Sequence, residues 1–307
     1  MTRAGVKPAW LLGLLLLAAT PTDAWAHGGV PAEIAALDAK LEGDTTDAER
    51  AARLTERASL YVRRRDFAAA FADLNEAYDL APEHAAILYE RGRLFAAVDL
   101  ATAAEWDLSG FLALEPRHVK ARLARARVRE GAGHIADARA DYEAAFAVEP
   151  SLDASLGLGG LERKAGDLDA AAAAYERGLD ALGDALALRV ALVEVETERR
   201  HYDRALELLD ALIAKAQVTA DLRLQRAEVL AAAGRSSEAK KERQDALAEL
   251  DALLKKRPSM LRRLSRAKAL LALDREEEAR PELLEVVEEA PDLDEARELL
   301  HSLRERR

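Results

Sequence analysis

The residues of this sequence that could carry out chemistry are its histidines, its many carboxylates and one short glycine-rich run. His84 and His118 each follow a proline by two residues, while His134 and His201 stand in short turn segments. None has the HExxH or His/carboxylate spacing of a metal site. The sequence contains no cysteine, which excludes thiol nucleophiles, thiolate zinc sites and disulfides. We therefore predict no catalytic residue, no metal site among these residues and no cofactor.

The glycine-rich run GLGG contains Gly157, Gly159 and Gly160, and it resembles part of a dinucleotide-binding loop. The third required glycine position is Glu162, and no strand is expected before the run, so we reject that interpretation. The sequence has no P-loop and no GxSxG motif. Most acidic pairs are expected on solvated helix faces. The sequence thus predicts a protein that is not an enzyme.

Residues 1–26 have the features of a secretory signal peptide. Arg3 and Lys7 give a positive start, residues 9–19 form an uncharged apolar run, and Ala24-Trp25-Ala26 fits the small-x-small cleavage pattern. The run is shorter than the ~20 residues of a membrane-spanning helix, which argues against the alternative, an uncleaved membrane anchor. No later segment is apolar enough to span a membrane. We expect an exported protein, periplasmic or secreted, after cleavage near Ala26.

Cleavage after Ala26 would make His27 the N-terminal residue, with an amine and a ring nitrogen that could bind copper. A working copper site would need a second histidine nearby, and the sequence does not indicate one. A flexible leader is the simpler interpretation, and a metal-binding protein built on His27 is kept as a distant alternative.

The charge balance argues against nucleic acid as a partner. The formal net charge is −11, from 45 Lys and Arg against 56 Asp and Glu, whereas nucleic-acid binding needs a cationic surface. The run RLARARVR from Arg122 to Arg129 is basic, but at ~100° per residue its arginines point to different helix faces.

The elements that position these residues form a repeat. Pro82, Pro116 and Pro150 lie 34 residues apart, and each ends the same pattern of small and aromatic residues. Numbering each unit from its first residue, a small residue recurs at position 8, Ala at 20, a small residue at 27 and Pro at 32. The repeats are predicted to start at 51, 85, 119, 152, 186, 220 and 260.

This unit resembles the tetratricopeptide repeat. The resemblance implies an all-α fold, a right-handed α-solenoid of antiparallel helix pairs with about seven units and capping helices. We predict a leader and N-terminal capping helix at 27–50, the solenoid at 51–291 and a solvating C-terminal helix at 292–307. The sixth unit is longer, which predicts an extended second helix over about 236–256. Arg57, Arg91 and Arg125 depart from the family pattern, because position 7 is usually apolar.

In this family the concave groove is lined by positions 2, 5, 9, 12 and 13 of the first helix. The lining is predicted to be basic in the first four repeats and acidic in the fifth and sixth, with Tyr89 as its one aromatic residue. The Lys and Asn that clamp a chain-terminal carboxylate in some relatives are absent. The predicted groove residues are Ser59, Arg63, Tyr89, Arg93, Lys120, Leu123, Arg127, Arg163, Lys164, Glu194, Glu198 and Glu228.

The resemblance implies a non-enzymatic scaffold of the cell envelope that binds a peptide or partner segment in this groove. We hypothesise a polarised groove that takes the acidic part of its partner toward the N-terminal repeats; the alternative is ordinary solvated charge. An accessory subunit of an envelope enzyme or of a secretion or assembly machine is the alternative function. The partner is expected to be a protein or peptide.

Overall fold

The computed structural model describes residues 29–305, and within this range every regular element is an α-helix. The predicted all-α fold of consecutive helix pairs is therefore confirmed. The predicted signal peptide and His27 lie outside the described residues. The described chain divides into two compact units, residues 29–191 (the N-terminal unit) and 192–305 (the C-terminal unit).

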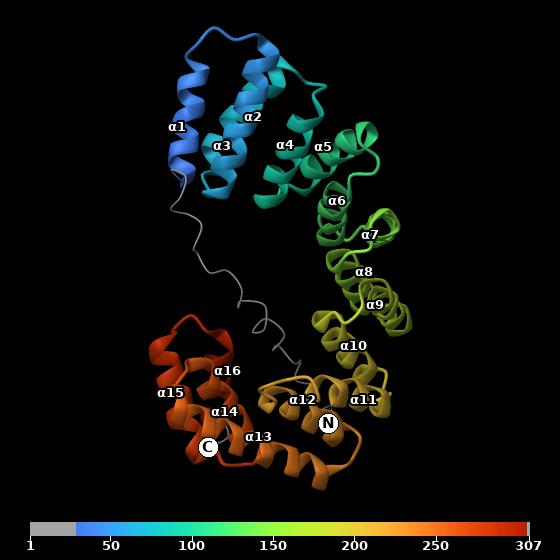
Figure 1. Ribbon diagram of the computed structural model, residues 1–307, viewed down its shortest axis with the longest axis vertical. Helices are drawn as coiled ribbons and strands as arrows, with labels where there is room; N and C mark the ends of the chain where they lie inside the picture. The colour runs from blue at the N-terminus through green and yellow to red at the C-terminus, as the bar shows by residue number, and fades with distance from the viewer. Residues whose placement is uncertain (1–28, 306–307) are drawn as a thin grey trace. The chain divides into compact units, whose positions relative to one another are not determined.

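The N-terminal unit is a stack of helix pairs, α2–α3, α4–α5, α6–α7 and α8–α9, with α1 packed on α2 (Figure 1). Its helices are α1 (Gly29–Leu41), α2 (Asp47–Arg63), α3 (Phe67–Leu80), α4 (Ala85–Ala97), α5 (Ala101–Leu114), α6 (Val119–Gly131), α7 (Ile135–Val148), α8 (Leu152–Ala165) and α9 (Leu168–Leu182). The boundary between the units falls within α10 (Leu186–Glu198).

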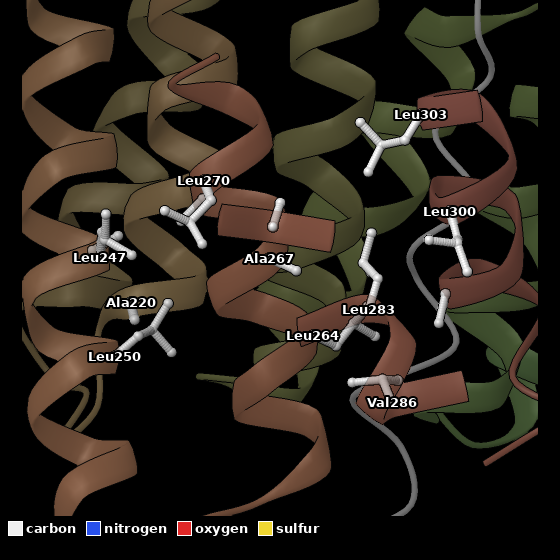
Figure 2. Packing of buried hydrophobic residues seen from close by; sticks show 14 residues of the cluster. Ala220, Leu247, Leu250, Leu264, Ala267, Leu270, Leu283, Val286, Leu300 and Leu303 are labelled. Atoms are coloured by element: carbon white, nitrogen blue, oxygen red, sulfur yellow. The ribbon is translucent and has the colours of Figure 1, made fainter. Parts of the chain in front are cut away.

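The C-terminal unit contains the pairs α12–α13 and α14–α15, with α11 before them and α16 after them. Its helices are α11 (Tyr202–Ile213), α12 (Ala220–Ala232), α13 (Ser236–Lys256), α14 (Met260–Ala272), α15 (Glu276–Glu289) and α16 (Asp294–Glu305). Figure 2 shows leucines of α13, α14, α15 and α16 packed around Ala267 in one apolar core. The terminal helix α16 contributes Leu300 and Leu303 to this core, as a capping helix should.

Helix ends follow local chemistry. The helices α3, α5 and α7 each end two residues before Pro82, Pro116 or Pro150, because the residue before proline avoids the α region. α2 begins earlier than the 51 given by the repeat period. Thr46 and Glu49 form a capping box there, in which the Thr46 hydroxyl accepts the Glu49 N–H and the Glu49 carboxylate accepts the Thr46 N–H.

The long α13 has a structural role as well as extra length. It spans Ser236–Lys256, as the longer sixth repeat predicts. Within it, Glu249 accepts the backbone N–H of Thr219 at 2.8 Å and its hydroxyl at 2.6 Å. Thr219 precedes α12, so α13 supplies a carboxylate to the N-terminus of its partner helix.

The arginines at position 7 form ion pairs with position 23 of the same repeat. The residues Asp73, Asp107 and Asp141 are 5%, 1% and 2% exposed, and the carboxylate of each receives two hydrogen bonds of 2.6–2.8 Å from its arginine. These pairs are Arg57–Asp73, Arg91–Asp107 and Arg125–Asp141. In the sixth and seventh repeats, Arg226 and Arg266 contact Glu242 and Glu282.

In the two remaining repeats, positions 7 and 23 are both apolar. The fourth repeat has Leu158 and Ala174, and the fifth has Leu192 and Leu208. The arginines also reach the preceding helix pair, since Arg125 donates to Ser109. The arginines that depart from the family pattern therefore belong to buried arginine–carboxylate pairs that tie neighbouring units together.

The turn inside each helix pair holds one residue in the left-handed region. Position 15 is Gly133, Gly166 and Gly234 in three repeats, with φ between +78° and +86°. In the others it is a non-glycine residue: Arg65 (φ 61°), Asp99 (60°), Arg200 (64°) and Asp274 (59°). A side chain in this region costs about 1–2 kcal/mol, because Cβ crowds the following carbonyl oxygen.

Replacing Arg65 by glycine is therefore expected to raise the free energy of unfolding by about 1 kcal/mol. Arg65 is exposed, so little packing is lost. Gly166→Ala is the matched control, and it should lower stability by a similar amount. Urea unfolding followed by circular dichroism measures both. If Arg65→Gly destabilised the protein as Gly166→Ala does, the strain assigned to this turn would be absent.

Candidate functional site

The first helices of neighbouring pairs approach each other. In the N-terminal unit α2 contacts α4, α4 contacts α6 and α6 contacts α8; in the C-terminal unit α12 contacts α14. Among the described helices, second helices of neighbouring pairs make no contact of comparable extent. The first helices are thus the inner layer of each stack. We call the residues at positions 2, 5, 9, 12 and 13 of α2, α4, α6 and α8 the first-helix surface of the N-terminal unit.

The predicted groove residues differ in exposure. Exposed residues are Arg63, Arg93, Lys120, Arg127, Lys164, Glu198 and Glu228; half-buried residues are Ser59, Tyr89, Arg163 and Glu194. The prediction for Leu123 needs correction, because its side chain is only 5% exposed and packs with Tyr142 and Leu158. Its apolar side chain is drawn into the core at a position where a polar residue would face solvent.

Tyr89 belongs to an aromatic cluster. Its ring centroid lies 5.0 Å from those of Phe111 and His118, which are also 5.0 Å from each other. Arg93 lies 5.5 Å from the Tyr89 centroid and is held by Glu90 at 2.9 Å. Burial raises the pKa of Tyr89. The cluster fixes the tyrosine ring on α4, so one half-buried aromatic side chain is presented in a fixed position beside an exposed arginine.

Two ion pairs connect α6 to α8. Arg127 lies 3.2 Å from Asp153, and Lys164 Nζ lies 2.5 Å from Glu130. Glu130 also accepts a hydrogen bond of 2.9 Å from the hydroxyl of Tyr142, whose pKa is raised mainly by burial. We call Arg127, Asp153, Glu130 and Lys164 the four-charge frame. Arg127, Asp153 and Lys164 are exposed and Glu130 is half-buried, and the four charges are matched within the protein.

The glycines of α8 have different surroundings. A Cβ on Gly157 would lie 2.3 Å from the ring of Tyr142, and one on Gly159 would lie 2.2 Å from the ring of Tyr175. These glycines make room for buried tyrosines, and α8 is a continuous helix rather than a dinucleotide loop. A Cβ on Gly160 would meet nothing within 4 Å. Packing therefore explains Gly157 and Gly159 but not Gly160.

Replacing Gly159 or Gly160 by alanine should change the free energy of unfolding in opposite directions. Gly159→Ala is expected to lower the free energy of unfolding by about 1–3 kcal/mol, because Tyr175 must move. Gly160→Ala should raise it by about 1 kcal/mol, the difference in helix propensity. Thermal and urea unfolding of both variants measure the contrast. A loss of stability in Gly160→Ala would reveal a packing constraint at this position.

The first-helix surface of the N-terminal unit is basic although the chain has a net charge of −11. It carries two carboxylates, Glu130 and Asp153, and both are engaged by basic residues of the same surface. The basic residues of this surface are Arg63, Arg93, Lys120, Arg127, Arg163 and Lys164. Such a local excess of positive charge favours acidic groups on a partner.

The corresponding positions of the C-terminal unit are acidic. They include Glu198, Asp221 and Glu228, with Lys268 of α14 as a basic residue. The side chain of Glu228 reaches solvent, yet the surrounding protein partly desolvates it and raises its pKa, against the opposing effect of Arg243 and Lys268. Glu228 thus contacts solvent while many protein atoms lie near it, as expected for a residue on an inner surface.

One exposed aromatic residue was not predicted from the sequence as a candidate for binding. Trp106 of α5 is 78% exposed, and it occupies a position where the neighbouring repeats have Ala72 and Ala140. Comparing repeats position by position could have found it. It lies on a second helix, away from the first-helix surface. Within residues 29–305, no cluster of three or more His, Asp or Glu side chains could hold a metal ion.

In the described part of the chain, every helix is too short or too polar to cross a bilayer. A family model described as Tetratricopeptide repeat matches residues 55–110, 123–185 and 240–294, more than half of the chain. Comparison with curated protein sequences gives no match.

Solved structures share the fold at low sequence identity. A tetratricopeptide repeat protein from Parabacteroides merdae is 18% identical with a TM-score of 0.58, covering 83% of this chain and 99% of its own. PilF of Pseudomonas aeruginosa is 14% identical with a TM-score of 0.52, covering 71% and 96%. PilW, a type IV pilus biogenesis factor, is 19% identical with a TM-score of 0.51, covering 66% and 98%.

Proposed function

Since the chain belongs to the tetratricopeptide repeat family, we propose that it is a non-enzymatic scaffold that binds a segment of a partner protein on its first-helix surfaces. The observation that carries the proposal is the basic first-helix surface of the N-terminal unit on an acidic chain. If the charged side chains of this surface served only to keep it hydrated, their charge would be expected to have the same sign as the net charge of the chain. Here the local charge has the opposite sign.

Binding on this surface is a set of reversible contacts with no bond chemistry. Arg93 and Arg127 attract the acidic part of a partner, while Tyr89 offers an apolar contact in a fixed orientation. Exposed ion pairs contribute only about 0–1 kcal/mol each, so their basic members can exchange one carboxylate for another. The acidic first-helix residues of the C-terminal unit give a second surface, suited to basic groups.

We propose the cell envelope as the location, based on the signal-peptide features of residues 1–26. The similarity of fold to PilW supports a second candidate within the same class, an accessory subunit of an envelope assembly machine. The two candidates differ in stoichiometry. A scaffold releases its partner reversibly, whereas an accessory subunit purifies in a fixed ratio with the other components of its machine.

The experiment that tests the function uses residues 27–307 as bait in an envelope extract, with chemical cross-linking and mass spectrometry. One protein should be captured repeatedly, and its cross-links should fall on the first helices. Bait carrying Arg93→Glu and Arg127→Glu is the control, and it should capture less of this protein. Equal capture by both baits, with cross-links confined to the second helices, would contradict the proposal.

A further inference from the structure

The end of α13 and the start of α14 carry an excess of positive charge. No acidic residue occurs between Asp251 and Asp274, although the chain as a whole has a net charge of −11. The basic residues of this stretch are Lys255, Lys256, Arg257, Arg262, Arg263, Arg266 and Lys268. A run of this kind on an acidic chain needs a local explanation, either in the packing of the C-terminal unit or in something that the unit binds.

Ion pairs within the C-terminal unit account for three of these residues. The pairs are Arg263–Glu285 at 2.6 Å, Arg266–Asp251 at 2.6 Å and Lys268–Glu295 at 2.5 Å. Within the described range 29–305, the other four form no ion pair, not even with the exposed Glu288 and Glu289 at the end of α15. We call these four residues, Lys255, Lys256, Arg257 and Arg262, the basic tip.

The basic tip lies beyond the core. Leu250 is the last residue of α13 in the apolar core of the C-terminal unit (Figure 2), and Lys256 lies six residues or about 9 Å further along the helix. Arg262, in the first turn of α14, donates to the carbonyl oxygen of Arg257 at 2.6 Å and joins the two helix ends. Arg262 is half-buried, and the other three residues of the tip are exposed.

The repeat fold does not require this basic end. Basic residues in the last turn of a helix interact favourably with its dipole, which could explain Lys255 and Lys256. The second helices α3, α5, α7, α9, α11 and α15 nevertheless end without a basic residue in the last turn, and they have 12 to 15 residues. α13 has 21 residues, and its additional length is what carries the two lysines away from the core.

An apolar side chain lies among these charges. Leu261 directly precedes Arg262 and is 46% exposed. Exposed basic residues around an exposed leucine are typical of a surface that binds anionic lipid, because the charges attract headgroups while the apolar side chain enters the acyl boundary. A single-stranded nucleic acid would favour aromatic side chains for stacking, and the stretch from Asp251 to Asp274 contains none.

We propose that the basic tip docks on an anionic phospholipid bilayer, with Lys255, Lys256 and Arg257 at the headgroup phosphates and Leu261 in the acyl boundary. A cluster of four basic residues is enough for such peripheral attachment. This interaction is separate from the proposed binding of a partner protein. It would hold the C-terminal unit on a membrane surface and leave the first-helix surface of the N-terminal unit free for the partner.

The test measures sedimentation of residues 27–307 with lipid vesicles. The chain should bind vesicles of equal parts phosphatidylcholine and phosphatidylglycerol, less tightly as salt is added, and should not bind phosphatidylcholine alone. Lys255→Gln/Lys256→Gln should weaken binding roughly thirtyfold, at about fivefold for each basic residue. The matched control Lys240→Gln/Lys241→Gln removes the same charge from two exposed lysines of the same helix and should keep wild-type affinity.

A fluorescent label tests the apolar contact. The sequence has no cysteine, so Leu261→Cys can be labelled alone with an environment-sensitive dye, and Lys240→Cys is the control. Vesicles with phosphatidylglycerol should shift the emission of the Leu261→Cys label to the blue, and the control label should not respond. Equal binding by the two lysine variants would overturn the inference. Polyglutamate or DNA bound as tightly as vesicles, with no shift at Leu261→Cys, would assign the tip to a soluble polyanion and overturn it too.

Discussion

Replacing Asp107 by alanine is expected to lower the free energy of unfolding by about 3–5 kcal/mol, the cost of breaking a buried ion pair by removing one partner. Asp107 is 1% exposed and accepts two hydrogen bonds from Arg91, at 2.6 and 2.8 Å. The variant would leave the Arg91 guanidinium largely buried beside Tyr78 without its carboxylate. Urea unfolding followed by circular dichroism measures the loss.

The fourth repeat supplies the control. Its positions 7 and 23 are Leu158 and Ala174, both buried in an apolar core. The double variant Arg91→Leu/Asp107→Ala copies this solution, and it should recover most of the stability lost in Asp107→Ala, since apolar replacement of a whole buried pair is often neutral. A double variant as unstable as the single one would show that the pair does not act as a unit.

The sequence predicted the fold well because the repeat period is strong. The helices at the start of the later units begin at Ala85, Val119, Leu152, Leu186, Ala220 and Met260, the numbers given by the period. The proline spacing predicted the helix ends. The start of α2 differed because a capping box overrides the period locally.

The candidate site was less predictable, because it depends on contacts between helices. The position-7 arginines looked like departures until the structure placed carboxylates of the following helix against them. Comparing positions 7 and 23 across repeats could have revealed them, since both are charged or both apolar in each repeat. Leu123 could not be separated from its polar equivalents by position alone, because burial depends on the neighbouring side chains.

Reversing Arg93 and Arg127 to glutamate is expected to weaken binding of the captured partner by roughly a hundredfold. The two arginines lie at position 9 of α4 and α6, and both are exposed. The variant replaces attraction with repulsion at two points of the same surface. Its stability should change little, because both arginines are exposed and their ion pairs, together with the contact of Arg93 with the Tyr89 ring, are screened by water.

Lys240→Glu/Lys241→Glu is the matched control. These two lysines are exposed on the second helix α13, and the double change alters the net charge by the same amount. The control should keep wild-type affinity. Equal weakening by the control and by the arginine variant would mean that net charge, rather than the first-helix surface, governs binding.

The most direct test of the account is the salt dependence of this binding. Titration calorimetry of the purified partner should be repeated at several salt concentrations with the wild-type chain, the arginine variant and the lysine control. The account predicts that affinity falls with salt for the wild type and the lysine control, and that Arg93→Glu/Arg127→Glu binds weakly with a much smaller salt dependence. Unchanged affinity and salt dependence in the arginine variant would contradict it.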